Sequence, residues 1–188
     1  DGRYYFIRHR NTVWTPAWQP VKTELDSYEC RHGLGYSRFT ASKNKIQAEL
    51  TAFVPLKESC EVNRLILTNH NTTEETIDLT SYVEFCFWNA VDDSTNFQRN
   101  LSLGEVEVEE STIYHKTEYR ERRNHFAYYT VNSPVAGFDT SRDDFLGVYG
   151  SIEHPETVYA GISHNSVASG GAVIGSHHLK LTLKPGES

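Results

Sequence analysis

Apolar and polar residues alternate with a period of two through much of this sequence. The alternation is clear in residues 47–54, 61–68 and 75–88, and strict in residues 104–109, which read G-E-V-E-V-E. A period of two places alternate side chains on opposite faces of a strand, whereas an amphipathic helix needs a period near 3.6. No window of ten or more residues carries a helical stripe. The sequence therefore predicts an all-β fold, an antiparallel β-sandwich.

Polar segments separate these strands and indicate how they connect. The turn-forming residues 69–74 lie between two strand-like segments, so residues 61–68 and 75–88 are predicted to form an antiparallel hairpin. Further strands are predicted at residues 111–116, 125–131 and 178–183. A Pro-Gly turn follows the last of them, and we expect another strand to begin after it.

Composition limits the classes of function. A length of 188 residues fits one domain, and the formal charge of −7, without long blocks of one sign, argues against a nucleic-acid partner. No apolar run could span a membrane. The three cysteines lack the close spacing of zinc or redox sites, which favours reduced thiols in the cytoplasm, with Cys86 as a core residue. The nine histidines show no metal-ligand spacing, so no metal is expected. The chain contains no Met, which suggests an internal fragment.

The segment 92–100, D-D-S-T-N-F-Q-R-N, is the main candidate for chemistry. Gln98 and Arg99 would point to opposite faces of a regular strand, but the preceding Asp, Ser and Asn residues favour an irregular backbone. An Arg fork and a Gln amide there could bind sugar hydroxyls or a carboxylate. Residue types alone favour a plain polar turn over a ligand site.

In three other segments the residue pattern favours a structural role over a functional one. In residues 117–125 each face of an extended strand would carry acids and bases, which favours ion pairing over an anion clamp. Gly33-Leu34-Gly35 lacks the third glycine of a dinucleotide fingerprint and indicates a turn with positive φ. The serines of residues 166–171 lack a nucleophile-elbow context, which favours a loop.

Several long motifs, in order, resemble the N-terminal domain of cellobiose phosphorylases of glycoside hydrolase family 94. They are WTPAWQPVK (14–22), YECRHGLGY (28–36), VEFCFWNA (83–90), DDSTNFQRN (92–100) and YHKTEYRERRNH (114–125). The resemblance covers residues 1–188. It implies a β-sandwich of the supersandwich, galactose-mutarotase-like type whose first strands are missing here, followed in the family by a helical linker and an (α/α)6 barrel.

The resemblance also implies a reaction. Family members cleave cellobiose with inorganic phosphate, with inversion, to α-glucose 1-phosphate and glucose; they form homodimers and use no cofactor or metal. The catalytic Asp belongs to the barrel, so this chain alone is expected to be inactive and Asp92 and Asp93 are not its catalytic acids. Gln98 and Arg99 match the positions that contribute to the acceptor-sugar subsite.

Two alternatives remain beside this expectation. One is a freestanding carbohydrate-binding β-sandwich without a catalytic partner. The other is a phosphorylase for a related β-disaccharide.

Overall fold

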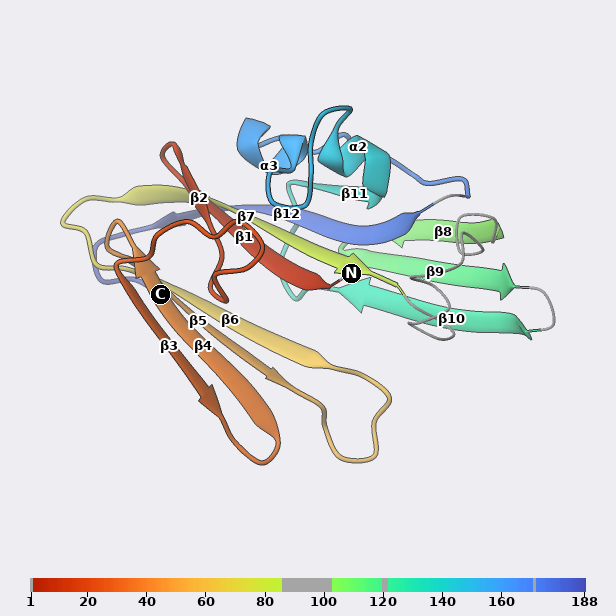
Figure 1. Ribbon diagram of the computed structural model, residues 1–188, viewed down its shortest axis with the longest axis horizontal. Coiled ribbons are helices and arrows are strands. Elements are labelled where there is room, and N and C mark those ends of the chain that lie inside the picture. Colours follow the sequence, from red (N-terminus) through yellow and green to blue (C-terminus); the bar gives the residue numbers. More distant parts are fainter. Residues whose placement is uncertain (1, 86–102, 120–121, 171) are drawn as a thin grey trace. The chain divides into compact units, whose positions relative to one another are not determined.

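The computed structural model describes residues 2–85, 103–119, 122–170 and 172–188, with only the backbone described at 103–104, 117–119 and 122–125 (Figure 1). The described chain is built almost entirely from antiparallel strands, which confirms the all-β prediction. Its helices are two single-turn segments, α2 (Arg142–Leu146) and α3 (Glu156–Ala160). Within the described residues, no helix is long and apolar enough to cross a membrane.

The chain forms two compact units, each assembled from separate stretches of sequence. The first unit contains Asp1–Tyr5 and Asp78–Lys180, and the second contains Phe6–Ile77 and Leu181–Ser188. One sheet has the strand order β11-β12-β7-β1-β2. Its strands are β1 (Arg3–His9), β2 (Thr12–Trp14), β7 (Glu75–Glu84), β11 (Gly137–Ser141) and β12 (Val173–Leu183).

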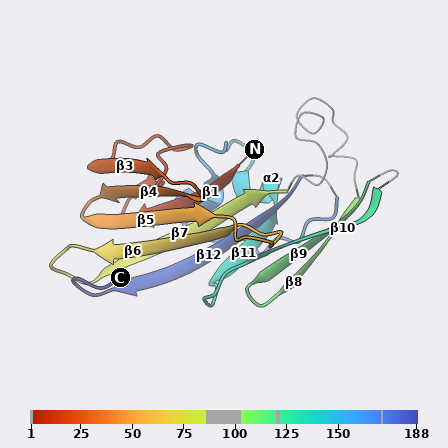
Figure 2. The same cartoon turned by 90° about the horizontal axis from the view of Figure 1, so that it is seen from below.

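The second unit carries a regular four-stranded sheet of consecutive antiparallel strands. They are β3 (Ser27–His32), β4 (Tyr36–Lys43), β5 (Ile46–Phe53) and β6 (Val62–Asn69) (Figures 1 and 2). In β5 the alternate residues Ile46, Ala48 and Leu50 are buried. The strands predicted at residues 47–54 and 61–68 are thereby confirmed to within one residue.

The hairpin predicted between residues 61–68 and 75–88 is wrong. Strand β6 belongs to the four-stranded sheet, whereas β7 lies between β12 and β1 in the other sheet. The main chain of Asn69, at the end of β6, exchanges hydrogen bonds with Gly186 and Glu187 near the C-terminus. Strand β7 is buried at most positions, as expected for a central strand with neighbours on both edges. Polar turn residues predict a reversal of direction, but they do not determine which strand becomes the neighbour.

The Gly33-Leu34-Gly35 segment does form the predicted turn, between β3 and β4. The N–H of Gly33 donates to the carbonyl of Tyr36 at 2.9 Å. The expected positive φ is absent, because neither Gly33 nor Gly35 is among the residues with positive φ. A Cβ at position 33 would clash with the ring of Tyr36, so glycine lets this ring lie against the turn.

The first unit carries a three-stranded antiparallel sheet of order β10-β9-β8. Its strands are β8 (Leu103–Glu109), β9 (Thr112–Tyr119) and β10 (Arg122–Thr130). This confirms the strands predicted at 104–109, 111–116 and 125–131. In the same unit, Ser141 caps α2 by accepting a hydrogen bond from the N–H of Asp144. The Phe145 ring of this helix packs on Tyr82 at 4.9 Å between centroids.

Candidate functional site

Gln98 and Arg99, the predicted sugar-binding residues, lie outside the described residues, as do Asp92 and Asp93. Both strands that flank their segment are described: β7 ends at Glu84, and β8 begins at Leu103. Described groups on and next to these two strands therefore border the candidate segment.

A partly buried ion pair lies at the end of β7. The Nε of Arg142, the first residue of α2, donates to Oε1 of Glu84 at 3.1 Å, and the hydroxyl of Tyr82 donates to the same oxygen at 2.5 Å. The Glu84 side chain is only 7% exposed. Burial opposes ionisation of Glu84, but the hydrogen bonds from Tyr82 and Arg142 outweigh it and lower the carboxyl pKa. Burial, together with Glu84, raises the pKa of Tyr82.

The sheet that begins with β8 has two faces of different character. The strand register aligns its residues in rows across β8, β9 and β10. One row is Glu105, Lys116 and Phe126, and the next is Glu107, Tyr114 and Tyr128. These residues share the exposed face, because successive residues of a strand alternate between faces.

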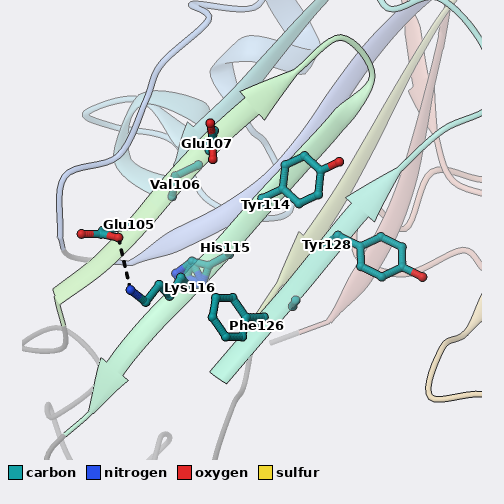
Figure 3. A pocket seen from close by; sticks show the side chains of 9 residues that line it. Glu105, Val106, Glu107, Tyr114, His115, Lys116, Phe126 and Tyr128 are labelled. Atoms are coloured by element: carbon teal, nitrogen blue, oxygen red, sulfur yellow. Dashed lines mark ion pairs between the residues drawn. The ribbon is translucent and has the colours of Figure 1, made fainter. Parts of the chain in front are cut away.

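The exposed face contains a cavity of about 570 Å³ that crosses all three strands (Figure 3). Its side-chain walls are the two rows Glu105, Lys116, Phe126 and Glu107, Tyr114, Tyr128. Between the rows lie Val106, His115 and Ala127, whose side chains point to the opposite face. We call this cavity the β8–β10 trough.

The inner face of the same sheet is packed with aromatic rings. His115 stacks on Phe85, the residue directly after β7, with 5.1 Å between ring centroids and 8° between planes. Burial lowers the pKa of His115 to about 4. On the neighbouring strand, Tyr129 stacks on His177 at 5.0 Å. Phe85, at the β7 side of the segment that carries Gln98 and Arg99, thus stacks on the sheet that contains β8.

The adjacent histidines of β12 lie on opposite faces of the strand and have different partners. His177 stacks on Tyr129, whereas His178 donates from Nε2 to Oδ1 of Asp78 at 2.9 Å. Across the part of the chain that the structure describes, no three His, Cys, Asp or Glu residues are grouped to hold a metal ion.

Other residues singled out in the sequence have structural roles. Ser166 donates from Oγ to Asp139 at 2.8 Å, and this carboxylate also accepts from the N–H groups of Ser166 and His164. These hydrogen bonds hold the loop that begins at Ser166, in agreement with the predicted loop at residues 166–171. Cys30 and Cys60 are free, and Cys86 is outside the described residues.

The sequence did not identify the trough, although its signal is visible. Residues 126–130 read F-A-Y-Y-T, and the period-two pattern places Phe126 and Tyr128 on one face. Aromatic residues in a strand indicate packing as readily as ligand contact, and only the structure shows that this face is open. The ion-pair interpretation of residues 117–125 stays a prediction, since those side chains are not described.

Known proteins are similar to this chain along nearly its whole length. The family described as glycosyl hydrolase 94, supersandwich domain, matches residues 1–188. N,N'-diacetylchitobiose phosphorylase from Vibrio furnissii is 34% identical over 99% of the chain and 24% of its own length. Solabiose phosphorylase from Paenibacillus borealis is 32% identical over the same shares. The chain thus spans about a quarter of the length of these relatives.

Proposed function

Since this chain belongs to the glycosyl hydrolase 94 supersandwich family over residues 1–188, we propose that it is part of an inverting disaccharide phosphorylase. The proposal rests on one observation: 99% of the chain aligns at 32–34% identity with enzymes named as phosphorylases of disaccharides. The proposed reaction converts cellobiose and inorganic phosphate to α-glucose 1-phosphate and glucose.

The chemistry of inversion defines what the complete enzyme must supply. An acid protonates the departing glycosidic oxygen while phosphate attacks the anomeric carbon from the opposite face of the sugar. We assign the acid to the part of the protein beyond this chain. Inorganic phosphate is the proposed cosubstrate, with no bound cofactor.

Gln98 and Arg99 are the proposed contribution of this chain to substrate binding. A guanidinium and an amide can hydrogen-bond hydroxyls of the leaving glucose and hold it in line for departure. Their segment connects β7, held by the Glu84–Arg142 pair, to β8, in the sheet that stacks on Phe85 through His115. Strands fixed by such contacts provide a firm support for positioning residues on the segment between them.

The proposed setting is a homodimer in the cytoplasm. Free Cys30 and Cys60 suit a reducing compartment. The proposal of a homodimer is based on the resemblance to the family, whose members form homodimers.

Phosphate-dependent cleavage by the full-length protein tests the proposal. Cellobiose and N,N'-diacetylchitobiose are each supplied with and without phosphate, and α-glucose 1-phosphate or the corresponding amino-sugar phosphate is measured. We expect product from cellobiose only when phosphate is present. Equal cleavage without phosphate would indicate a hydrolase, and no cleavage of either sugar would reject both candidate substrates.

N,N'-Diacetylchitobiose is the second candidate substrate. It is favoured by the two Vibrio relatives, each 34% identical to this chain. Product from this sugar alone would favour the second candidate over cellobiose.

A further inference from the structure

The β8–β10 trough has a floor of main chain and walls of side chains. Its two rows are two residues apart along each strand, which separates the walls by about 7 Å. The trough crosses two strand spacings, which gives it a length of about 10 Å. The side chains of the intervening row point to the opposite face, so only main-chain atoms lie between the two rows.

The two ends of the trough differ in chemistry. At the β10 end, Phe126 and Tyr128 are 69% and 62% exposed, and Tyr114 beside them is 42% exposed. At the β8 end stand the carboxylates of Glu105 and Glu107, both exposed. Glu105 lies 3.8 Å from Nζ of Lys116 across the strand pair. Aromatic faces thus meet charged hydrogen-bonding groups within one slot (Figure 3).

We propose that the β8–β10 trough binds a pyranose sugar, as a disaccharide or a longer oligosaccharide. One ring would stack its C–H face on Tyr114 and Tyr128, and the next would place its hydroxyls at Glu105, Glu107 and Lys116. The cavity volume of about 570 Å³ lies within the range of about 300–1,000 Å³ typical of small-ligand sites. The inference rests on the proposed function for the class of sugar that the protein meets.

The charge of the trough discriminates against other ligands. Two carboxylates and one ammonium group give it a negative balance, which disfavours phosphates and nucleic acids. An apolar peptide segment would cover the aromatic rings but desolvate the carboxylates without hydrogen bonds. A sugar satisfies both ends, because it carries apolar C–H faces and hydroxyl donors on the same ring.

Hydrogen–deuterium exchange of the full-length protein, followed by peptide mass spectrometry, tests the proposal. Cellobiose and cellotetraose serve as probes, with phosphate omitted so that no turnover occurs. We expect both to slow exchange in peptides covering residues 103–116 and 122–130. The apparent Kd is obtained from the dependence of this protection on sugar concentration.

Variants assign the protection to the trough. Tyr128→Ala should raise the apparent Kd for the sugar by about tenfold. Tyr128→Phe keeps the aromatic ring, so its apparent Kd should stay close to that of the wild type. Thr130→Ala is the matched control, since Thr130 lies on the same face of β10 outside the trough and bonds Thr112 at 2.9 Å. If Tyr128→Ala fails to fold, Glu107→Gln replaces it, and this variant should raise the apparent Kd severalfold.

Two outcomes would overturn the inference. The peptides could show no sugar-dependent change in exchange while peptides elsewhere are protected and phosphorolysis is intact, in which case the proposed function stands and the trough assignment fails. Equal effects of Tyr128→Ala and Thr130→Ala would also reject it. If the wild-type protein shows sugar-dependent protection of these peptides but no phosphorolysis, the proposed function is rejected and the trough assignment stands.

Discussion

The imidazole ring of His177 stacks on the ring of Tyr129, with 5.0 Å between their centroids and 17° between their planes. The histidine is 1% exposed, and among the described residues neither ring nitrogen has a hydrogen-bond partner. Burial therefore lowers the pKa of His177 to about 4. An unfolded histidine titrates near pH 6.5. As the pH falls below 6.5, the unfolded chain binds this proton before the folded chain does, so stability decreases down to about pH 4.

His177→Phe should remove this pH dependence while keeping the aromatic stack. At pH 7.5 the free energy of unfolding should change by less than about 1 kcal/mol. At pH 5 the variant should be more stable than the wild type by about 2 kcal/mol, because the proton linkage is gone. Urea unfolding of the chain at both pH values measures the difference. His70→Gln, at an exposed position, is the control and should leave the pH dependence unchanged.

Glu75 should make the second unit sensitive to stronger acid. Arg10 donates to its carboxylate at 2.7 Å, and His9 and Thr73 each donate at 2.8 Å. These hydrogen bonds, that of Arg10 above all, lower the pKa of Glu75 to about 2. A lowered carboxyl pKa stabilises the fold above the unfolded value, near 4.3, and this contribution is lost as the pH falls toward about 2.

Glu75→Gln should flatten the stability profile between about pH 4.3 and 2. Urea midpoints taken across this range measure the slope. Glu49→Gln serves as the comparison, since Glu49 forms only a 3.7 Å ion pair with the partly exposed Arg38. A slope that remains the same in Glu75→Gln as in the wild type would contradict the assignment.

Arg142→Leu should destabilise the first unit by about 1.5–3 kcal/mol, because it removes a charge-assisted hydrogen bond to the Glu84 carboxylate, whose side chain is 7% exposed. The Arg142→Leu, Glu84→Gln double variant should recover part of this loss. Urea unfolding of the two single variants and the double variant completes the cycle. Additive losses would show that Arg142 and Glu84 do not interact energetically.

Period-two alternation was sufficient to place strands with one buried face. It predicted β5, β6, β8 and β9 because alternate residues such as Ile46, Ala48 and Leu50 enter a core. It failed for β3, where all six residues are exposed and no burial pattern distinguishes the two faces. It also missed α2 and α3, because five residues are too few to display a helical stripe.

The sequence could not predict which strands pair with each other or that the trough is exposed, because both depend on contacts between residues distant in sequence. The turn after β6 indicates a change of direction, but hydrogen bonds from Asn69 to residues distant in sequence determine where the chain continues. Likewise, Tyr114 and Tyr128 fit a strand equally well whether their face is covered or open. The family resemblance, and not alternation, directed attention to Gln98 and Arg99, whose role stays a prediction.

Asn69→Leu should destabilise the second unit by about 2–4 kcal/mol. The buried amide donates from Nδ2 to the carbonyls of Thr73 and Leu183, each at 2.9 Å, and accepts from the N–H of Asn71. A leucine of similar size leaves these main-chain groups without partners, and each buried unsatisfied group costs about 1–3 kcal/mol. Urea unfolding measures the loss. Asn63→Leu is a suitable control, because Asn63 bonds only the nearby Glu61 side chain. Equal losses in the two variants would contradict the role of Asn69.

Arg99→Ala in the full-length enzyme should act on the acceptor sugar. If Arg99 donates a charge-assisted hydrogen bond to a glucose hydroxyl, its loss costs about 1.5–3 kcal/mol. This corresponds to a roughly 10- to 150-fold decrease in kcat/KM for glucose in the synthetic direction. The KM for α-glucose 1-phosphate should change little, because that sugar occupies the other side of the scissile bond. Initial rates with each substrate varied in turn measure both quantities, and Asn100→Ala is the neighbouring control.

The split between the two substrates is the informative part of this experiment. Misfolding or a lost dimer would lower both kinetic parameters together, and circular dichroism with size-exclusion chromatography would report such a defect directly. A selective effect on glucose requires a contact made with the acceptor. Equal losses for glucose and α-glucose 1-phosphate, or no loss for either, would remove Arg99 from the acceptor subsite and leave Gln98 to be tested on its own.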